Sequence, residues 1–138
     1  MDAIQNLALT QPSYTPEQQL NVNKFLDKIC KELKQKCKEI LSILTEQMLD
    51  LALDYDTVTQ VLVLIGSIYH FQADAINIIS TNIPNFKHPF DAEEVATQCQ
   101  NYYKMGLKCA TSNLDNGDPI KINLVVKICT FFEEIKKN

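Results

Sequence analysis

Residues 57–69, TVTQVLVLIGSIY, decide the fold that this sequence predicts, because they are apolar on nearly every side of a helix. Such a helix is typical of the centre of a helical protein, where other helices cover it. We expect it to begin at a cap on Asp56 or Thr57 and to reach about Ser80. Gly66 leaves room beside it for another element to approach closely. One polar stripe remains, formed by Thr59, Ser67, His70, Asp74 and Asn77.

Three more helices are predicted around this central one. The first follows Thr15-Pro16, a typical N-cap and first helical residue, and is expected to run to about residue 53. Its apolar face repeats at three-and-four spacing from Leu26 to Met48 and includes Ile40 and Leu44. The third helix follows a cap on Asp91. The fourth follows a cap on Asp118; its first residues alternate like a strand, but the cap and the apolar run after them favour a helix.

The composition fits one helical domain. The chain has 138 residues, of which 46% are hydrophobic, and only 3 are Gly and 5 are Pro, too few for an all-β fold with many tight turns. The predicted fold is therefore all-α, an antiparallel bundle of about four helices over residues 15–138. Residues 1–14 are expected to form an irregular N-terminal segment.

The charges limit the partners that we expect. All 13 basic residues are lysine, so the rigid fork with which arginine binds a phosphate or carboxylate is missing. A net charge of -4 argues against nucleic acid. No stretch reaches the roughly 20 apolar residues that span a bilayer, and residues 1–10 lack the pattern of a signal peptide, so no membrane contact is expected.

The reactive residues form no motif typical of catalysis or metal binding. Cys99 or Cys109 with His88 would need a third, orienting residue to act as a nucleophile, and none is visible. We therefore predict no enzyme, no cofactor and no metal, and a cytoplasmic location, with the cytoskeleton as one setting. The cysteines occupy apolar helical positions without a CxxC pair, which indicates buried thiols in a reducing compartment: Cys30, Cys37, Cys99, Cys109 and Cys129.

Three collinear segments resemble the 14-3-3 family. Residues 32–44, ELKQKCKEILSIL, are similar to the family's ELRDICNDVLSLL, and residues 66–74, GSIYHFQAD, to its GDYYRYLAE. Residues 118–135, DPIKINLVVKICTFFEEI, resemble HPIRLGLALNFSVFYYEI without a gap. The resemblance covers roughly residues 25–135 and implies the central helices of a 14-3-3 fold, which serves as a scaffold or adaptor for other proteins. Helical repeats of the TPR type share this spacing and stay the main alternative.

The resemblance also implies that the phosphate pocket of the family is degenerate here. The family's Arg-Tyr pair falls on His70-Phe71, and its groove asparagine falls on Lys127. Residues 1–20 show no counterpart of the family's dimerising N-terminal helices, and the last two family helices would follow Asn138. His70 is mostly neutral at pH 7 and lysine is a point charge, so strong phosphate capture is not expected.

The fourth helix carries a wide apolar arc. Leu124 and Ile128 are natural core positions, and the apolar surface extends beyond them at Val125, Val126, Cys129 and Phe132. Either the whole arc packs inside the domain, or a partner protein or second copy covers it. The sequence leaves both interpretations open.

The predicted function is that of a non-catalytic protein-interaction or structural subunit with a 14-3-3-like fold. Its partner is another protein, a larger assembly or a second copy of the chain. The alternative is a weak phosphoserine- or phosphothreonine-peptide adaptor that uses His70 and Lys127; against it, Asp74 is a natural partner for His70 one helical turn away. The residues expected to line the groove are Thr59, Ser67, His70, Phe71, Asp74, Asn123, Val126, Lys127 and Thr130.

Overall fold

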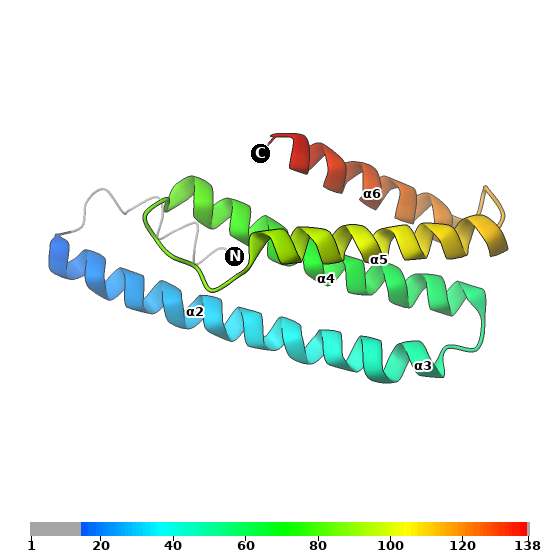
Figure 1. Ribbon diagram of the computed structural model, residues 1–138, viewed down its shortest axis with the longest axis horizontal. Helices are drawn as coiled ribbons and strands as arrows, with labels where there is room; N and C mark the ends of the chain where they lie inside the picture. Colours follow the sequence, from blue (N-terminus) through cyan, green and yellow to red (C-terminus); the bar gives the residue numbers. More distant parts are fainter. Residues whose placement is uncertain (1–14, 138) are drawn as a thin grey trace.

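The computed structural model describes residues 15–137 as a bundle of four long helices (Figure 1). This confirms the all-α, antiparallel prediction, and the described residues contain no strand. The irregular segment expected over residues 1–14 lies outside them. The elements are α2 (Pro16–Ile43), which continues through a π-helical turn η2 (Leu44–Met48) into α3 (Leu49–Leu51), then α4 (Tyr55–Asn82), α5 (Ala92–Asn113) and α6 (Pro119–Lys137).

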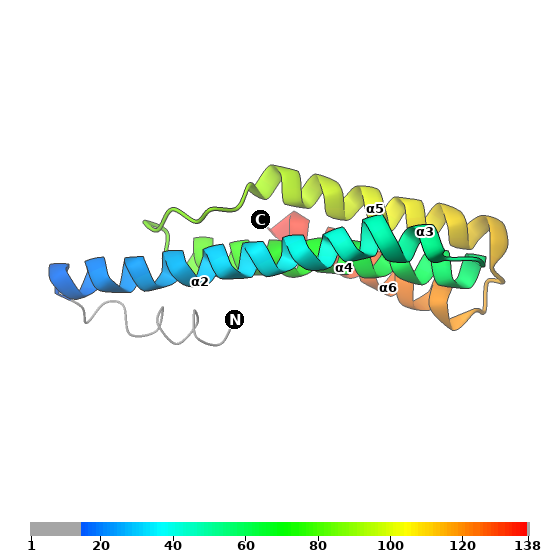
Figure 2. The ribbon, with the colours of Figure 1, turned by 90° about the horizontal axis from the view of Figure 1, so that it is seen from below.

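The central position belongs to α4, which packs against α2, α5 and α6. Figures 1 and 2 show α2 and α6 on opposite sides of the α4–α5 pair. By length and composition alone, α4 could also cross a membrane, which corrects the expectation that no segment is apolar enough. Its packing against every other helix is that of the core helix of a bundle.

Local capping explains where the helices begin. The Thr15 side chain accepts a hydrogen bond from the Gln18 backbone, and the Asp91 side chain accepts one from Glu94, as expected. The cap of α4, however, is Asp54 rather than Asp56 or Thr57. Its carboxylate accepts a hydrogen bond from the Thr57 backbone N–H at 2.7 Å, which lowers the pKa of Asp54. The chain is already extended at Asp54, so the helix begins earlier than the sequence predicts.

The π-helical turn of the first long helix changes which residues face the core. The backbone N–H of Leu49 donates to the carbonyl of Leu44, five residues earlier, so the turn holds one extra residue. Beyond it, Leu49 packs against the core, whereas Met48, expected on the buried face, is exposed. The predicted apolar face is therefore lost after Leu44, and it is already interrupted at Ile40, which is 43% exposed.

A close contact joins α4 to α5. The ring of Tyr103 lies directly against the backbone of Gly66, where a Cβ would be 2.5 Å from Tyr103 Cδ1. This is the close approach for which Gly66 left room. Tyr103 is 2% exposed and shares a core cluster with Leu124 and Phe131 of α6. Packing around this ring thus connects three helices.

We expect Gly66→Ala to lower the free energy of unfolding by about 2 kcal/mol. The added Cβ meets a buried ring, and overpacking costs about 1–3 kcal/mol, while helix propensity returns less than about 1 kcal/mol. Chemical denaturation followed by circular dichroism measures the change. The control is Gly106→Ala, whose Cβ would lie 3.4 Å from Leu124 Cδ2, an ordinary contact. Equal effects of both substitutions would contradict a special role for the Gly66 contact.

Candidate functional site

An open groove runs between α4, α6 and the π-helical turn. It has a volume of about 560 Å³ and is lined mainly by apolar side chains, among them Leu44, Val61 and Leu64. Its polar lining includes Lys127 of α6, whose Nζ donates a hydrogen bond to Ser67 Oγ at 3.3 Å. Ser67 in turn donates to the Val63 carbonyl, which holds the hydroxyl in place. The groove therefore combines an apolar wall with one positive charge.

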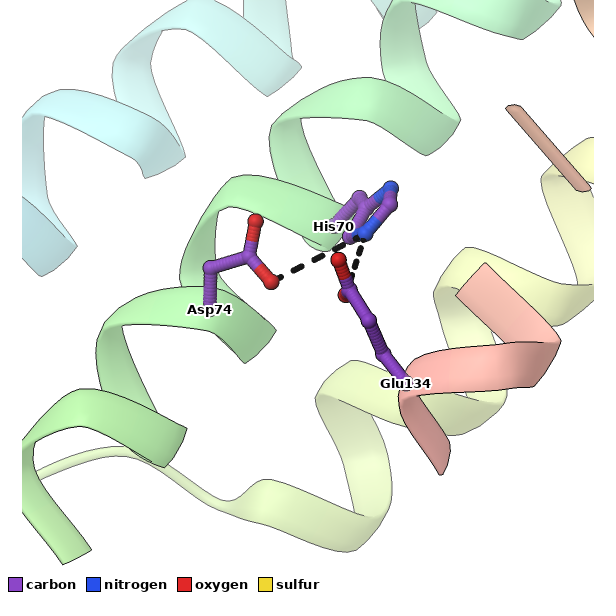
Figure 3. Close-up of side chains that lie close together, drawn as sticks. All are labelled: His70, Asp74 and Glu134. Carbon is purple, nitrogen blue, oxygen red and sulfur yellow. Dashed lines mark hydrogen bonds and ion pairs between the residues drawn. The ribbon is translucent and has the colours of Figure 1, made fainter. Parts of the chain in front are cut away.

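A polar cluster joins the same two helices further along (Figure 3). His70 Nε2 lies 2.7 Å from Glu134 Oε2 of α6 and 3.8 Å from Asp74 Oδ1. The other ring nitrogen, Nδ1, lies 3.2 Å from the Tyr103 hydroxyl oxygen. Phe131 covers the imidazole, with ring centroids 5.3 Å apart. The histidine is thus held on both nitrogens and packed between α4, α5 and α6.

The electrostatics of this cluster are dominated by its carboxylates. Partial burial raises the pKa of Asp74 to about 6, and a hydrogen bond and charge repulsion from Glu134 add to this, while the nearby His70 opposes it. A cation or a proton placed among these side chains is therefore favoured over an anion. His70 is engaged by Glu134 and Tyr103, more closely than by Asp74, the partner that the sequence favoured.

The structure separates the predicted groove residues into groups. Ser67, Asn123 and Lys127 line the groove together. His70 and Asp74 belong to the polar cluster instead. Thr59 is fully buried against α5, where its hydroxyl donates to Cys109 Sγ at 3.3 Å, so it cannot contact a ligand in the groove.

The other three predicted residues lie on the surface. Phe71, Val126 and Thr130 are exposed and do not line the groove. Val126 instead borders a shallow hollow with Lys121 and Val125. Glu134 is absent from the predicted groove residues. It follows Lys127 by seven residues, about two helical turns, so both lie on the same face of α6, and this spacing was the available signal.

The surroundings of Cys99 argue against a nucleophilic role for its thiol. Cys99 is buried and its thiol donates to the Gly66 carbonyl; burial, with the charges of Asp74 and Glu134, raises the pKa of Cys99 to about 12. A thiol with such a pKa is almost entirely protonated at neutral pH and is a poor nucleophile. Cys129 is exposed, which corrects the prediction that all thiols are buried. The α6 face that carries Cys129 points away from the core.

Comparison with known proteins does not assign the chain to a family. The sequence matches no protein-family model and no curated protein sequence. The 14-3-3 resemblance accordingly stays a prediction carried by the three segments that resemble it.

We expect Asp74→Asn to raise the free energy of unfolding by about 1 kcal/mol at pH 7.5 in the presence of EDTA. The pKa of about 6 means that the ionised Asp74 carboxylate is disfavoured in the folded state. Because the side chain is 47% exposed, solvent screens much of this unfavourable free energy. The ionised carboxylate lowers the free energy of unfolding of the native chain progressively as the pH rises from the ordinary pKa of 3.8 to about 6, and by a constant amount above that. The gain on substitution should therefore vanish near pH 4. Urea denaturation across this pH range measures it, and a gain independent of pH would contradict the assignment.

We also expect a maleimide probe to label Cys129 first in the folded protein. Cys30, Cys37 and Cys99 are buried, and burial raises the pKa of each, so they should react only on unfolding. Intact-mass spectrometry over time resolves the order of labelling, with the half-buried Cys109 reacting after Cys129 and before the buried thiols. Cys129→Ser should remove the fastest phase; rapid labelling of Cys99 in that variant would show that its thiol is accessible and reactive.

Proposed function

We propose that this chain is a non-catalytic protein-interaction subunit with a 14-3-3-like helical core, which binds an apolar segment of a partner protein in the groove between α4 and α6. The observation that carries this proposal is the apolar wall that α4 leaves uncovered. Leu64 lines the groove and is 50% exposed although it belongs to the core helix. The groove volume falls within the roughly 300–1,000 Å³ typical of binding pockets.

The outer face of α6 supports the same proposal. Two interpretations of its apolar arc were open, and the described residues favour exposure: Leu124 is fully buried, but Val126 is 58% exposed. Exposed apolar side chains continue along the helix at Ile122, Val125, Phe132 and Ile135. Extended apolar surfaces of this kind mark sites of protein contact. A partner seated in the groove would reach this face as well.

The surroundings of His70 weigh against the alternative of a phosphopeptide adaptor. Phosphate recognition uses several convergent cationic donors. His70 lies beside the carboxylates of Asp74 and Glu134, which repel an anion, and Lys127 is the one cation that lines the groove. We infer instead that Lys127 meets an acidic or carbonyl group at the polar part of an otherwise apolar partner segment.

A pull-down with a matched pair of variants tests this function. Leu64→Lys places a charge on the groove wall and should abolish capture of the partner by the tagged chain. Met105→Lys on α5, at a side chain that is 48% exposed and lines no groove of α4 and α6, should leave capture unchanged. Half of each lysate is treated with phosphatase, and the proposal predicts equal capture in both halves. A cooperative thermal unfolding transition of each variant checks that it is folded.

Two results would overturn the proposal. Loss of the partner after phosphatase treatment, with dependence on Lys127 and His70, would favour the phosphopeptide adaptor. Capture that Leu64→Lys and Met105→Lys reduce equally would show that the groove is not the binding surface. The proposed setting is the cytoplasm, in keeping with the unpaired state of all five cysteines.

A further inference from the structure

We propose that His70, Asp74 and Glu134 form a binding site for one Zn²⁺ ion that joins α4 to α6. Each side chain offers one ligand atom, and these atoms all lie within 4.8 Å of one another. His70 and Asp74 are one helical turn apart on α4 and meet Glu134 from α6, as Figure 3 shows. Glu134 lies 64 residues from His70 along the chain, so no cluster of metal-ligating residues is visible in the sequence. The site is independent of what the groove binds.

The distances are close to those that a bound ion requires. Zn²⁺ binds imidazole nitrogen and carboxylate oxygen at about 2.0–2.2 Å, so the ligand atoms of a tetrahedral site lie roughly 3.4 Å apart. The distance from His70 Nε2 to Glu134 Oε2 is 2.7 Å, and to Asp74 Oδ1 it is 3.8 Å, one below and one above that value. Both carboxylates are partly exposed, so small side-chain rotations bring them to the required spacing.

The imidazole is already oriented for this role. A metal-binding histidine typically hydrogen bonds through its second nitrogen, which fixes the ring and its tautomer. In this chain Nδ1 lies 3.2 Å from the Tyr103 hydroxyl oxygen, and Phe131 packs edge-on against the ring. Without an ion, a proton lies between Nε2 and Glu134 in their 2.7 Å contact. When Zn²⁺ replaces that proton, Nδ1–H donates to Tyr103 and the lone pair of Nε2 points toward the ion. The His70 side chain is only 13% exposed, so it has little freedom to turn away.

The ligand set selects the class of ion. Two carboxylates and a neutral imidazole carry a charge that a divalent cation cancels, which relieves the repulsion between Asp74 and Glu134. Mg²⁺ and Ca²⁺ prefer ligands that are all oxygen, whereas an imidazole nitrogen favours Zn²⁺ and its first-row neighbours. A water molecule completes the coordination, as in other sites with three protein ligands. Because its ligands come from α4 and α6, the ion would fasten the C-terminal half of α6 to the core helix.

Calorimetric titration of the EDTA-treated full chain with ZnCl₂ tests the proposal. We expect saturable one-to-one binding, a rise in Tm of roughly 5 °C or more at saturating Zn²⁺, and no binding of Mg²⁺. Asp74→Asn keeps the shape of the side chain but removes a ligand charge, and should weaken Zn²⁺ binding roughly tenfold or more. Asp56→Asn makes the same change at an exposed position of α4 and should leave binding unaltered.

A second measurement on the native chain separates this site from the cysteines. Co²⁺ bound by imidazole and carboxylates shows visible d–d absorption, whereas Co²⁺ bound by a thiolate adds an intense near-ultraviolet charge-transfer band. We expect the first without the second. The proposal is overturned if Zn²⁺ does not bind saturably, if Asp74→Asn binds it as tightly as the native chain, or if the thiolate band dominates the Co²⁺ spectrum.

Discussion

The contact between the Tyr103 ring and Gly66 is the constraint on which the placement of α5 and α6 depends. Because Gly66 has no side chain, α5 lies against α4 with an aromatic ring over the backbone. The same ring carries its hydroxyl to His70, and His70 holds Glu134 of α6 at 2.7 Å. The absence of one Cβ therefore determines how closely two helices pack and where a third one docks.

The arrangement around α4 explains why the groove and the polar cluster exist side by side. With α5 along one side and α2 and α6 on opposite sides of the α4–α5 pair, part of α4 stays uncovered, and Leu64 lies there. Between the same two helices, α4 and α6, Lys127 meets Ser67 in the groove and Glu134 meets His70 in the cluster. Both the proposed partner groove and the proposed ion site therefore depend on where α6 packs against α4.

Local signals in the sequence were enough for the helices but not for the pairing of their side chains. Caps such as Thr15 and Asp91 act within a few residues, so they could be predicted. The π-helical turn, which exchanges Met48 for Leu49, depends on how the first helix fits against α4. Thr59 was grouped with Ser67 on one stripe, yet eight residues of helix turn about 80° beyond two full turns, which directs Thr59 to α5. Periodicity likewise gave the face of Glu134 but not its partner, 64 residues away.

The unequal coverage of the helices also has a consequence for the order in which the chain folds. The α4–α5 hairpin is close in sequence and has the most extensive helix–helix contact, so we expect it to form early, because local contacts cost little chain entropy. α6 docks onto that hairpin through a narrow buried strip at Leu124 and Phe131, with apolar side chains left on its outer face. Its opening is then a local unfolding event of low cost. A partner of the kind proposed would cover this helix, so a chain that lacks such a partner would leave α6 open to chaperones and proteases.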